Sequence, residues 1–284
     1  MILRLLNIRL MLAIGVLFIT NIILAQDANF HIYLCFGQSN MEGQGAIEEK
    51  DRIVDARFQV MAALDCKELN RQKGEWYTAV PPLGFCNKGL SPADYFGRTM
   101  VANLSDSIKV GVISVAIGGC DIRLFDKDQY RDYDSKDGKA WFERKVASYG
   151  GHPYNCLIEL AQKAQQDGVI KGILLHQGET NTGNAEWPMY VQKIYNDMLE
   201  DLSLEADEVP ILVGEMVSEP DNCCATMNPI IHTLPEVIPN AHVISSAACP
   251  AKDRAHFNAE GYRMIGKRYG EKMLSLMKNV ERKN

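Results

Sequence analysis

The 284-residue sequence lacks a cluster of basic residues, a Cys-x-x-Cys pair and any internal repeat or linker. It holds 30 lysine and arginine residues against 36 aspartate and glutamate residues, which gives a formal charge of −6. Nucleic-acid phosphates are bound by clustered basic side chains, so a nucleic-acid partner is not expected. Without a Cys-x-x-Cys pair, a structural zinc site is not expected either. The missing repeat and linker favour a single domain.

Long apolar runs are also scarce, and one segment alone approaches the length of a membrane span. Residues 10–25 read LMLAIGVLFITNIILA and follow the basic residues Arg4 and Arg9. This order predicts a signal peptide over residues 1–25, cleaved near Ala25, and a secreted or periplasmic domain over 26–284 without stable membrane insertion. An uncleaved membrane anchor is the alternative, because the run is of borderline spanning length. Cleavage brings the formal charge to −8, which suits a neutral or weakly charged substrate.

The eight cysteines can form disulfides if the protein is exported. Cys66 and Cys86 flank a loop-like segment and are the predicted bridge. Cys35 and Cys156 lie in apolar stretches, where a free thiol behaves as a small hydrophobic group.

Short apolar runs alternate with amphipathic helical patterns along the chain. With 46% hydrophobic and 23% charged residues, the composition is that of a globular protein. Nearly continuous apolar strands are typical of a parallel sheet covered on both faces. The pattern therefore predicts an α/β three-layer sandwich, α/β/α, with a mostly parallel five-stranded sheet. The predicted strands are residues 30–36, 110–117, 169–176, 209–216 and 241–247.

Helix boundaries and two long polar segments complete the outline. Ser91, followed by Pro92 and Asp94, predicts a capped helix start, and Gly168 predicts the end of the helix before it. Residues 46–90 and 121–150 show little periodicity and follow strand ends, where open α/β sheets bind ligands. We interpret them as loops that shape a substrate cleft; surface insertions without function are the alternative.

Polar residues gather directly after three predicted strands and before the last helix. They are Gly37-Gln38-Ser39-Asn40, Gly118-Gly119, His176-Gln177-Gly178-Glu179-Thr180-Asn181 and Asp253-Arg254-Ala255-His256. A serine becomes a nucleophile when an imidazole takes its proton, and a carboxylate on the other ring nitrogen holds that imidazole. Ser39, His256 and Asp253 can fill these roles. The N–H groups of Ser39 and Gly119 and the Gln177 amide can stabilise an oxyanion, with Asn181 as a second amide in reserve.

The blocks GQSNM, HQGETN and DRAHF resemble the motifs of SGNH/GDSL-type hydrolases. More narrowly, they resemble carbohydrate esterases grouped with acetylxylan esterases of carbohydrate esterase family six and with sialate O-acetylesterases. The resemblance spans Ser39 to His256. It implies a flavodoxin-like SGNH fold and removal of O-acetyl groups from sugars such as acetylated xylan or sialic acid, with no metal or other cofactor. It implies the same catalytic and oxyanion residues. Gln177 stands where the wider superfamily has asparagine, and the narrower esterase group is expected to have glutamine there.

Several alternatives stay open at this point. Glu179 can orient His256 in place of Asp253. His176 and Glu179 could ligate a metal, but no third ligand is evident. Trp76, Trp141 and Trp187 can each stack on a sugar or pack inside the protein, and Cys120 is expected to be structural. A non-catalytic carbohydrate-binding protein and a lipase or thioesterase of the same superfamily are the rival functions.

Overall fold

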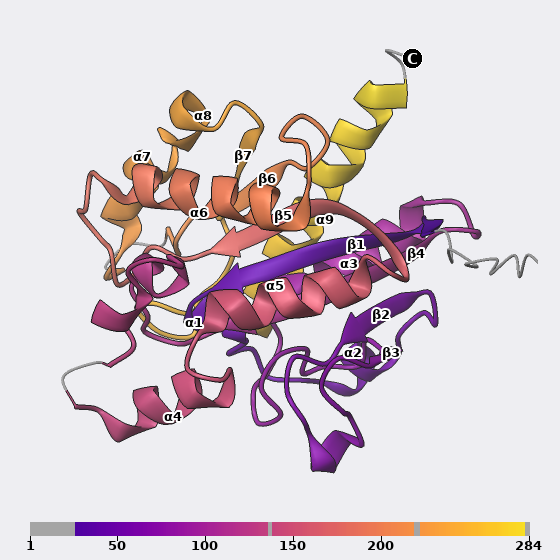
Figure 1. Ribbon diagram of the computed structural model, residues 1–284, viewed down its shortest axis with the longest axis horizontal. Coiled ribbons are helices and arrows are strands. Elements are labelled where there is room, and N and C mark those ends of the chain that lie inside the picture. Colours follow the sequence, from indigo (N-terminus) through magenta and orange to yellow (C-terminus); the bar gives the residue numbers. More distant parts are fainter. Residues whose placement is uncertain (1–25, 136–137, 219–221, 282–284) are drawn as a thin grey trace, which may run out of the picture.

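A single sheet of seven strands forms the centre of the protein in the computed structural model, which describes residues 26–135, 138–218 and 222–281 (Figure 1). The predicted signal peptide lies outside the described residues. The strand order is β3-β2-β4-β1-β5-β6-β7, and every pairing is parallel except that of β2 with β3. The strands are β1 (Asp27–Gly37), β2 (Phe58–Met61), β3 (Trp76–Thr78), β4 (Lys109–Ala116), β5 (Gly168–His176), β6 (Ile211–Gly214) and β7 (Ala241–Ile244).

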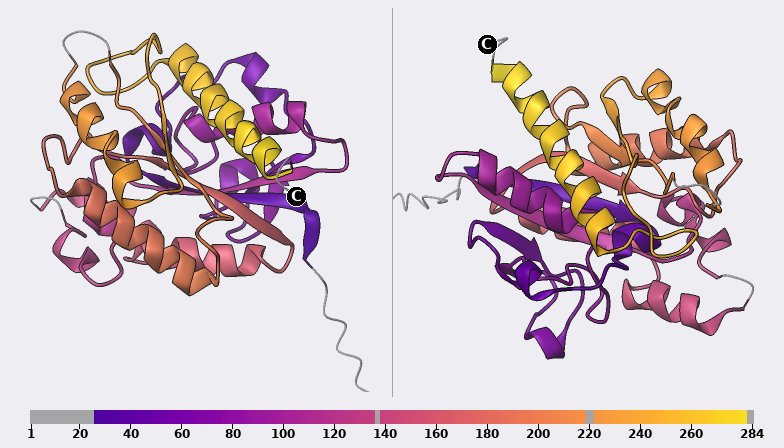
Figure 2. Two further views of the ribbon diagram at one scale, coloured as in Figure 1. Left: turned by 90° about the horizontal axis from the view of Figure 1, so that it is seen from above. Right: turned by 180° about the vertical axis from the view of Figure 1, so that it is seen from behind.

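Helices cover both faces of this sheet, as the two further views show (Figure 2). α3 and α9 pack against each other on one face, and α5 and α6 lie on the other. The helices are α1 (Ser39–Glu42), α2 (Glu49–Arg52), α3 (Pro92–Asn103), α4 (Ala140–Ser148), α5 (Pro153–Ala164), α6 (Trp187–Leu202), α7 (Asn228–Ile231), α8 (Leu234–Val237) and α9 (Ala259–Glu281). Short 3-10 turns are η1 (Lys67–Leu69), η2 (Ile122–Phe125), η3 (Tyr130–Asp132) and η4 (Ala225–Met227).

The α/β three-layer prediction is confirmed, and the five predicted strands correspond to β1, β4, β5, β6 and β7. Numbered in chain order, these five lie in the order 2-1-3-4-5, which is the flavodoxin-like arrangement. The predicted number of strands was too small, because β2 and β3 extend the sheet beyond β4. These two strands have four and three residues, too few for a periodic pattern to stand out in the sequence.

The two segments interpreted as loops contain regular structure as well. Residues 46–90 hold α2, β2 and β3, and residues 121–150 hold η2, η3 and α4. The capped start of α3 is confirmed, since the Ser91 N–H donates to the Asp94 carboxylate over 2.8 Å. Gly168 does not end a helix: α5 ends earlier, at Ala164, and Gly168 is the first residue of β5.

Burial on both faces of β1 explains its unbroken apolar sequence. Ile32, Leu34 and Phe36 lie in the core on the side of α5 and α6, whereas Tyr33 and Cys35 lie in the core under α3 and α9. All five side chains are fully buried. Successive residues of a strand point to opposite faces, so a strand between two helix layers needs apolar residues at every position.

Two disulfides join described residues. The predicted bridge between Cys66 and Cys86 is confirmed, with Cα atoms 5.8 Å apart, and the adjacent residues Cys223 and Cys224 form the second. Cys35, Cys120 and Cys156 are buried and take part in neither of these disulfides. In the part of the chain that the structure describes, no helix is long and apolar enough to span a membrane.

A buried ion pair fixes the 46–90 segment to the last helix. The Asp51 carboxylate of α2 accepts from the Arg263 guanidinium of α9 over 2.8 and 3.1 Å, and from the Tyr95 hydroxyl over 2.8 Å. Asp51 is fully buried and Arg263 is 8% exposed. A buried charge pair of this kind is costly to break from one side, because the remaining charge is left without its partner.

Arg263→Ala is therefore expected to lower the free energy of unfolding by about 3–5 kcal/mol, measured by urea denaturation. Adding Asp51→Ala to that variant should recover part of the loss, since no buried charge then remains. Lys267→Ala on the exposed side of α9 is the control. A loss below about 1 kcal/mol in Arg263→Ala, the level of a surface pair, would contradict this role.

Candidate active site

The candidate site lies at the carboxyl end of β1, where α1 begins at Ser39 (Figure 1). Gly37, the last residue of β1, pairs with Ala116 of β4 on one side and His176 of β5 on the other. The loops that follow these two strands therefore leave the sheet beside Ser39. The strand order reverses at this point, which is where open α/β sheets bind ligands.

Gly37 allows this close approach between the β1 end and β5. A Cβ atom at this position would lie 2.1 Å from the His176 carbonyl oxygen, and the φ angle of 146° also favours glycine. The next N–H, that of Gln38, donates to the same carbonyl over 3.0 Å. The glycine thus lets the chain turn into α1 with Ser39 at its first position.

Ser39, His256 and Asp253 form a continuous hydrogen-bonded chain. The Ser39 Oγ lies 2.9 Å from the His256 Nε2, and the His256 Nδ1 lies 2.9 and 3.0 Å from the two Asp253 oxygens. A carboxylate can only accept, so Nδ1 carries the ring hydrogen and Nε2 is free to take the serine proton. This is the order of groups that activates a serine nucleophile.

Local backbone geometry holds the Asp253 carboxylate in its charged form. One of its oxygens accepts from the N–H groups of Ala255 and His256, each over 2.9 Å. Partial burial acts to raise the pKa of Asp253, but these hydrogen bonds and the His256 ring outweigh it and lower the pKa. The carboxylate is therefore ready to stabilise a protonated His256.

Glu179, the alternative acid, faces a different partner. Its carboxylate accepts from the Asn40 amide, and among the hydrogen bonds between described residues none joins Glu179 to His256. Burial raises the pKa of Glu179 to about 7, against the smaller effect of its hydrogen bonds. A carboxyl that is half protonated near neutral pH is a weak partner for an imidazolium.

Asn40 connects the helix that begins at Ser39 to the loop that carries His256. Its Nδ2 donates to the Ala255 carbonyl over 2.9 Å, and its Oδ1 accepts from the Tyr262 hydroxyl over 2.6 Å and from the Phe257 N–H over 3.4 Å. Asn40 is fully buried and stands next to Ser39 in the chain. Asn40 belongs to the motif GQSNM, but the spacing of the motif alone could not reveal that its side chain contacts the loop of His256.

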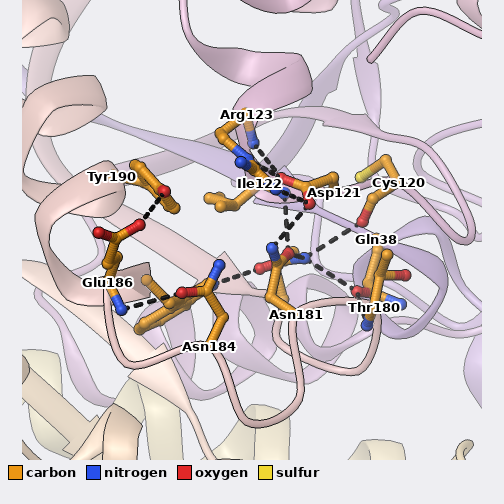
Figure 3. Close-up of polar contacts among 12 residues, drawn as sticks. Gln38, Cys120, Asp121, Ile122, Arg123, Thr180, Asn181, Asn184, Glu186 and Tyr190 are labelled. Carbon is orange, nitrogen blue, oxygen red and sulfur yellow. Dashed lines mark hydrogen bonds and ion pairs between the residues drawn. The ribbon is translucent and has the colours of Figure 1, made fainter. Parts of the chain in front are cut away.

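Gln177 and Asn181, expected as oxyanion donors, do not line the cavity at Ser39. Figure 3 shows the Asn181 side chain beside Asp121 and Ile122, with which it forms hydrogen bonds. The Gln177 amide donates to the Cys120 carbonyl and to the Gln38 Oε1, each over 3.1 Å, and also to Asn181. Asn181 in turn donates to Asp121 over 2.9 Å. Both side chains are buried in this network, and neither lines the cavity at Ser39.

Gln38 is the amide that does reach the cavity. Its Oε1 accepts from Gln177 and from the Thr180 N–H over 3.2 Å, so its carbonyl end is fixed toward the loop after β5. Its NH₂ group has no acceptor among the described residues, and Gln38 lines the cavity with Ser39 and Gly119. The sequence pattern did not single out Gln38 as a residue of the cavity, although it directly precedes Ser39.

The cavity at Ser39 has a volume of about 370 Å³ and a charged wall. Glu42, which is 2% exposed, accepts from the Gly118 N–H over 3.2 Å and is ion-paired with both Lys145 and Lys88. Trp141, 43% exposed, forms part of the same wall. The two polar segments after β1 and β4 therefore do shape the cavity, as predicted.

The remaining sequence candidates fall elsewhere. Trp187 is buried under Gln177, to which its ring N–H donates, and Trp76 packs against Phe30. His176 is buried, and this burial lowers its pKa to about 3. His176 and Glu179 belong to neither of the two groups of described residues whose spacing suits a metal ion. One of these groups contains the disulfide cysteines, and the other surrounds the Lys193 ammonium.

Solved structures share this fold over most of their length. A protein from Arabidopsis thaliana has a TM-score of 0.64 at 17% identity, covering 87% of this chain and 98% of that chain. NanS has a TM-score of 0.62 at 14% identity, covering 90% and 99%. A carbohydrate acetylesterase from Xanthomonas citri has a TM-score of 0.59 at 16% identity, covering 84% of this chain and 55% of its own.

The sequence itself matches a family described as carbohydrate esterase, sialic acid-specific acetylesterase, over residues 29–275. This match includes every residue of the Ser39–His256–Asp253 chain and both polar segments. The protein therefore belongs to this family of carbohydrate esterases and is a carbohydrate O-acetylesterase.

Proposed function

We propose that the protein hydrolyses O-acetyl esters of acetylated xylan or O-acetyl sialic acid through an acetyl-enzyme intermediate. The observation that carries the proposal is the hydrogen-bonded chain from the Ser39 hydroxyl through His256 to Asp253. In the first step the Ser39 Oγ attacks the acetyl carbonyl while the His256 Nε2 takes the serine proton. His256 then gives that proton to the departing sugar oxygen, which leaves as an alcohol.

Water completes the cycle. It loses a proton to His256 as it attacks the acetyl group on Ser39, and that proton passes to the Ser39 Oγ as acetic acid leaves, which then ionises to acetate in water. Asp253 remains charged throughout and stabilises the imidazolium in both halves. No redox or metal chemistry enters this sequence of steps.

Three donors are proposed for the oxyanion: the N–H groups of Ser39 and Gly119 and the Gln38 NH₂ group. Gln38 takes the role expected of Gln177, because Gln38 lines the cavity with the nucleophile. Gln177 then acts through Gln38, whose Oε1 it holds. Donors fixed in advance around a developing negative charge are worth several kcal/mol in the transition state.

The rival functions fit the site less well. A binding protein has no need for a serine hydrogen-bonded to a supported imidazole. A lipase or thioesterase needs an apolar channel for an acyl chain, whereas this cavity is walled by Glu42, Lys88 and Lys145. We also propose that the protein is exported, which two disulfides, Cys66–Cys86 and Cys223–Cys224, favour.

Ser39→Ala is expected to fold normally and to lose about 10⁶-fold in kcat, because the nucleophile is gone. The measurement is acetate release from acetylated xylan and from O-acetyl sialic acid, with labelling by a fluorophosphonate. Ser245→Ala, an exposed serine away from the triad, is the control. Wild-type turnover in Ser39→Ala would refute the mechanism.

Asp253→Asn and Glu179→Gln make the same chemical change at the two carboxyls. Asp253→Asn should lower kcat by about 10³–10⁴-fold, because the amide no longer stabilises the imidazolium. Glu179→Gln should cost less than about tenfold, since its oxygen can still accept from Asn40. The reverse order of effects would assign the orienting role to Glu179.

Glu179→Gln should also change how stability depends on pH. A carboxyl with a raised pKa favours the folded state below its unfolded pKa and loses that contribution as pH rises through its folded value. Stability of the wild type should therefore decline between about pH 4.5 and pH 7 relative to Glu179→Gln. Urea unfolding at pH 5 and pH 8 measures the difference; parallel curves would exclude the titration of Glu179.

Gln38→Glu and Gln177→Glu test the oxyanion assignment as a matched pair. Each change keeps the accepting oxygen and removes the donating NH₂ group. Gln38→Glu should lower kcat at least about 100-fold with little change in KM, because the loss occurs in the transition state. Gln177→Glu should mainly lower the urea midpoint. A larger fall in kcat for folded Gln177→Glu would restore Gln177 as the donor.

A further inference from the structure

A second cavity adjoins the one that holds Ser39. It has a volume of about 430 Å³ and shares two lining residues, Gln44 and Lys88, with the first cavity. Its other lining residues are Gly43, Gly45, Ala46, Ile47, Asn87, Gly89 and Lys252. The mechanism proposed above uses none of these residues. A ligand larger than one sugar can therefore extend from Ser39 past Lys88.

Three glycines, Gly43, Gly45 and Gly89, line the second cavity. Gly45 and Leu90 exchange N–H to carbonyl hydrogen bonds of 3.1 and 2.8 Å, and the Gly89 N–H donates to the Gly43 carbonyl over 3.1 Å. A Cβ atom on Gly89 would lie 1.9 Å from the Gly45 oxygen, and one on Gly43 would lie 2.4 Å from the Gly89 oxygen. Glycine is therefore required at positions 43 and 89 for this pairing, and the three glycines add no side chain to the cavity lining.

The charge of the second cavity is opposite to that of the whole protein. Its lining includes Lys88 and Lys252 and no acidic residue, in a chain whose formal charge is −6. The Lys252 Nζ donates to the Gln44 carbonyl over 2.9 Å, and the described residues give it no carboxylate partner.

Lys88 is also incompletely neutralised. Its partner Glu42, 3.2 Å away, is shared with Lys145, so one carboxylate faces two ammonium groups. The group formed by Glu42, Lys88 and Lys145 thus has one more ammonium than carboxylate. A lysine ammonium group has three N–H donors, and those not used within the protein can form charge-assisted hydrogen bonds to a carboxylate of a ligand.

We propose that the second cavity is a subsite for a carboxylate-bearing sugar next to the acetylated sugar. This inference rests on the proposed function, since it takes the acetyl ester to lie at Ser39. The carboxylate binds between Lys88 and Lys252, and the sugar ring lies against the lining glycines Gly43, Gly45 and Gly89. The preferred substrate is then an acidic oligosaccharide, deacetylated one unit away from its uronic or other acidic sugar.

The test compares acetylated xylo-oligosaccharides with and without a glucuronic acid substituent. For the wild type, kcat/KM should be higher on the acidic substrate, and this preference should shrink as salt rises. Lys252→Gln should reduce the ratio of acidic to neutral kcat/KM about tenfold, as expected for one charge-assisted hydrogen bond. Lys267→Gln makes the same charge change on the exposed side of α9 and should leave the ratio unchanged.

A binding measurement separates this subsite from the esterase proposal. Calorimetry on the Ser39→Ala protein, with the unacetylated acidic and neutral oligosaccharides, requires no turnover. Tighter binding of the acidic one, lost in Ser39→Ala/Lys252→Gln, supports the subsite even if hydrolysis fails on these substrates. Equal binding of both, or a ratio of kcat/KM that Lys252→Gln leaves unchanged, overturns the subsite while leaving acetate release as evidence for the esterase.

Discussion

One buried amide, that of Asn40, holds the two halves of the active site together. Ser39 comes from the first strand-to-helix junction, and His256 comes from the loop before the last helix. Asn40 joins them by donating to the Ala255 carbonyl and accepting from the Phe257 N–H and the Tyr262 hydroxyl. Hydrogen bonds on both ends of the amide leave it one orientation, so these buried hydrogen bonds fix the position of Ser39 relative to the loop of His256.

The central fold could be predicted from sequence because its strands bury both faces. Residues such as Ile32 and Tyr33 had to be apolar in succession, and this pattern marks β1 and its parallel neighbours. β2 and β3 escaped prediction because strands of four and three residues are too short for a periodic pattern to stand out. Gly168 was assigned to a helix end because glycine suits that position, whereas in the fold it lets β5 pass close to Phe30.

The site could be predicted in part, for a similar reason. Ser39, Asp253 and His256 follow strand ends or precede a helix, and parallel strands bring such positions to one edge. The orientation of an amide side chain is harder to predict, because it depends on hydrogen-bond partners from other parts of the chain. Gln177 turns inward because Trp187, Cys120 and Gln38 supply its hydrogen-bond partners, and these come from separate parts of the chain. No local pattern records that arrangement.

The hydrogen bond between Ser39 and His256 joins residues 217 positions apart. Contacts of such long sequence separation close the largest loops and require most of the chain to be ordered first. A nascent chain, or a fragment that ends before His256, has Ser39 but lacks the imidazole that is hydrogen-bonded to it. In the proposed mechanism, hydrolysis therefore begins only when the last segment has docked, so turnover reports completed folding.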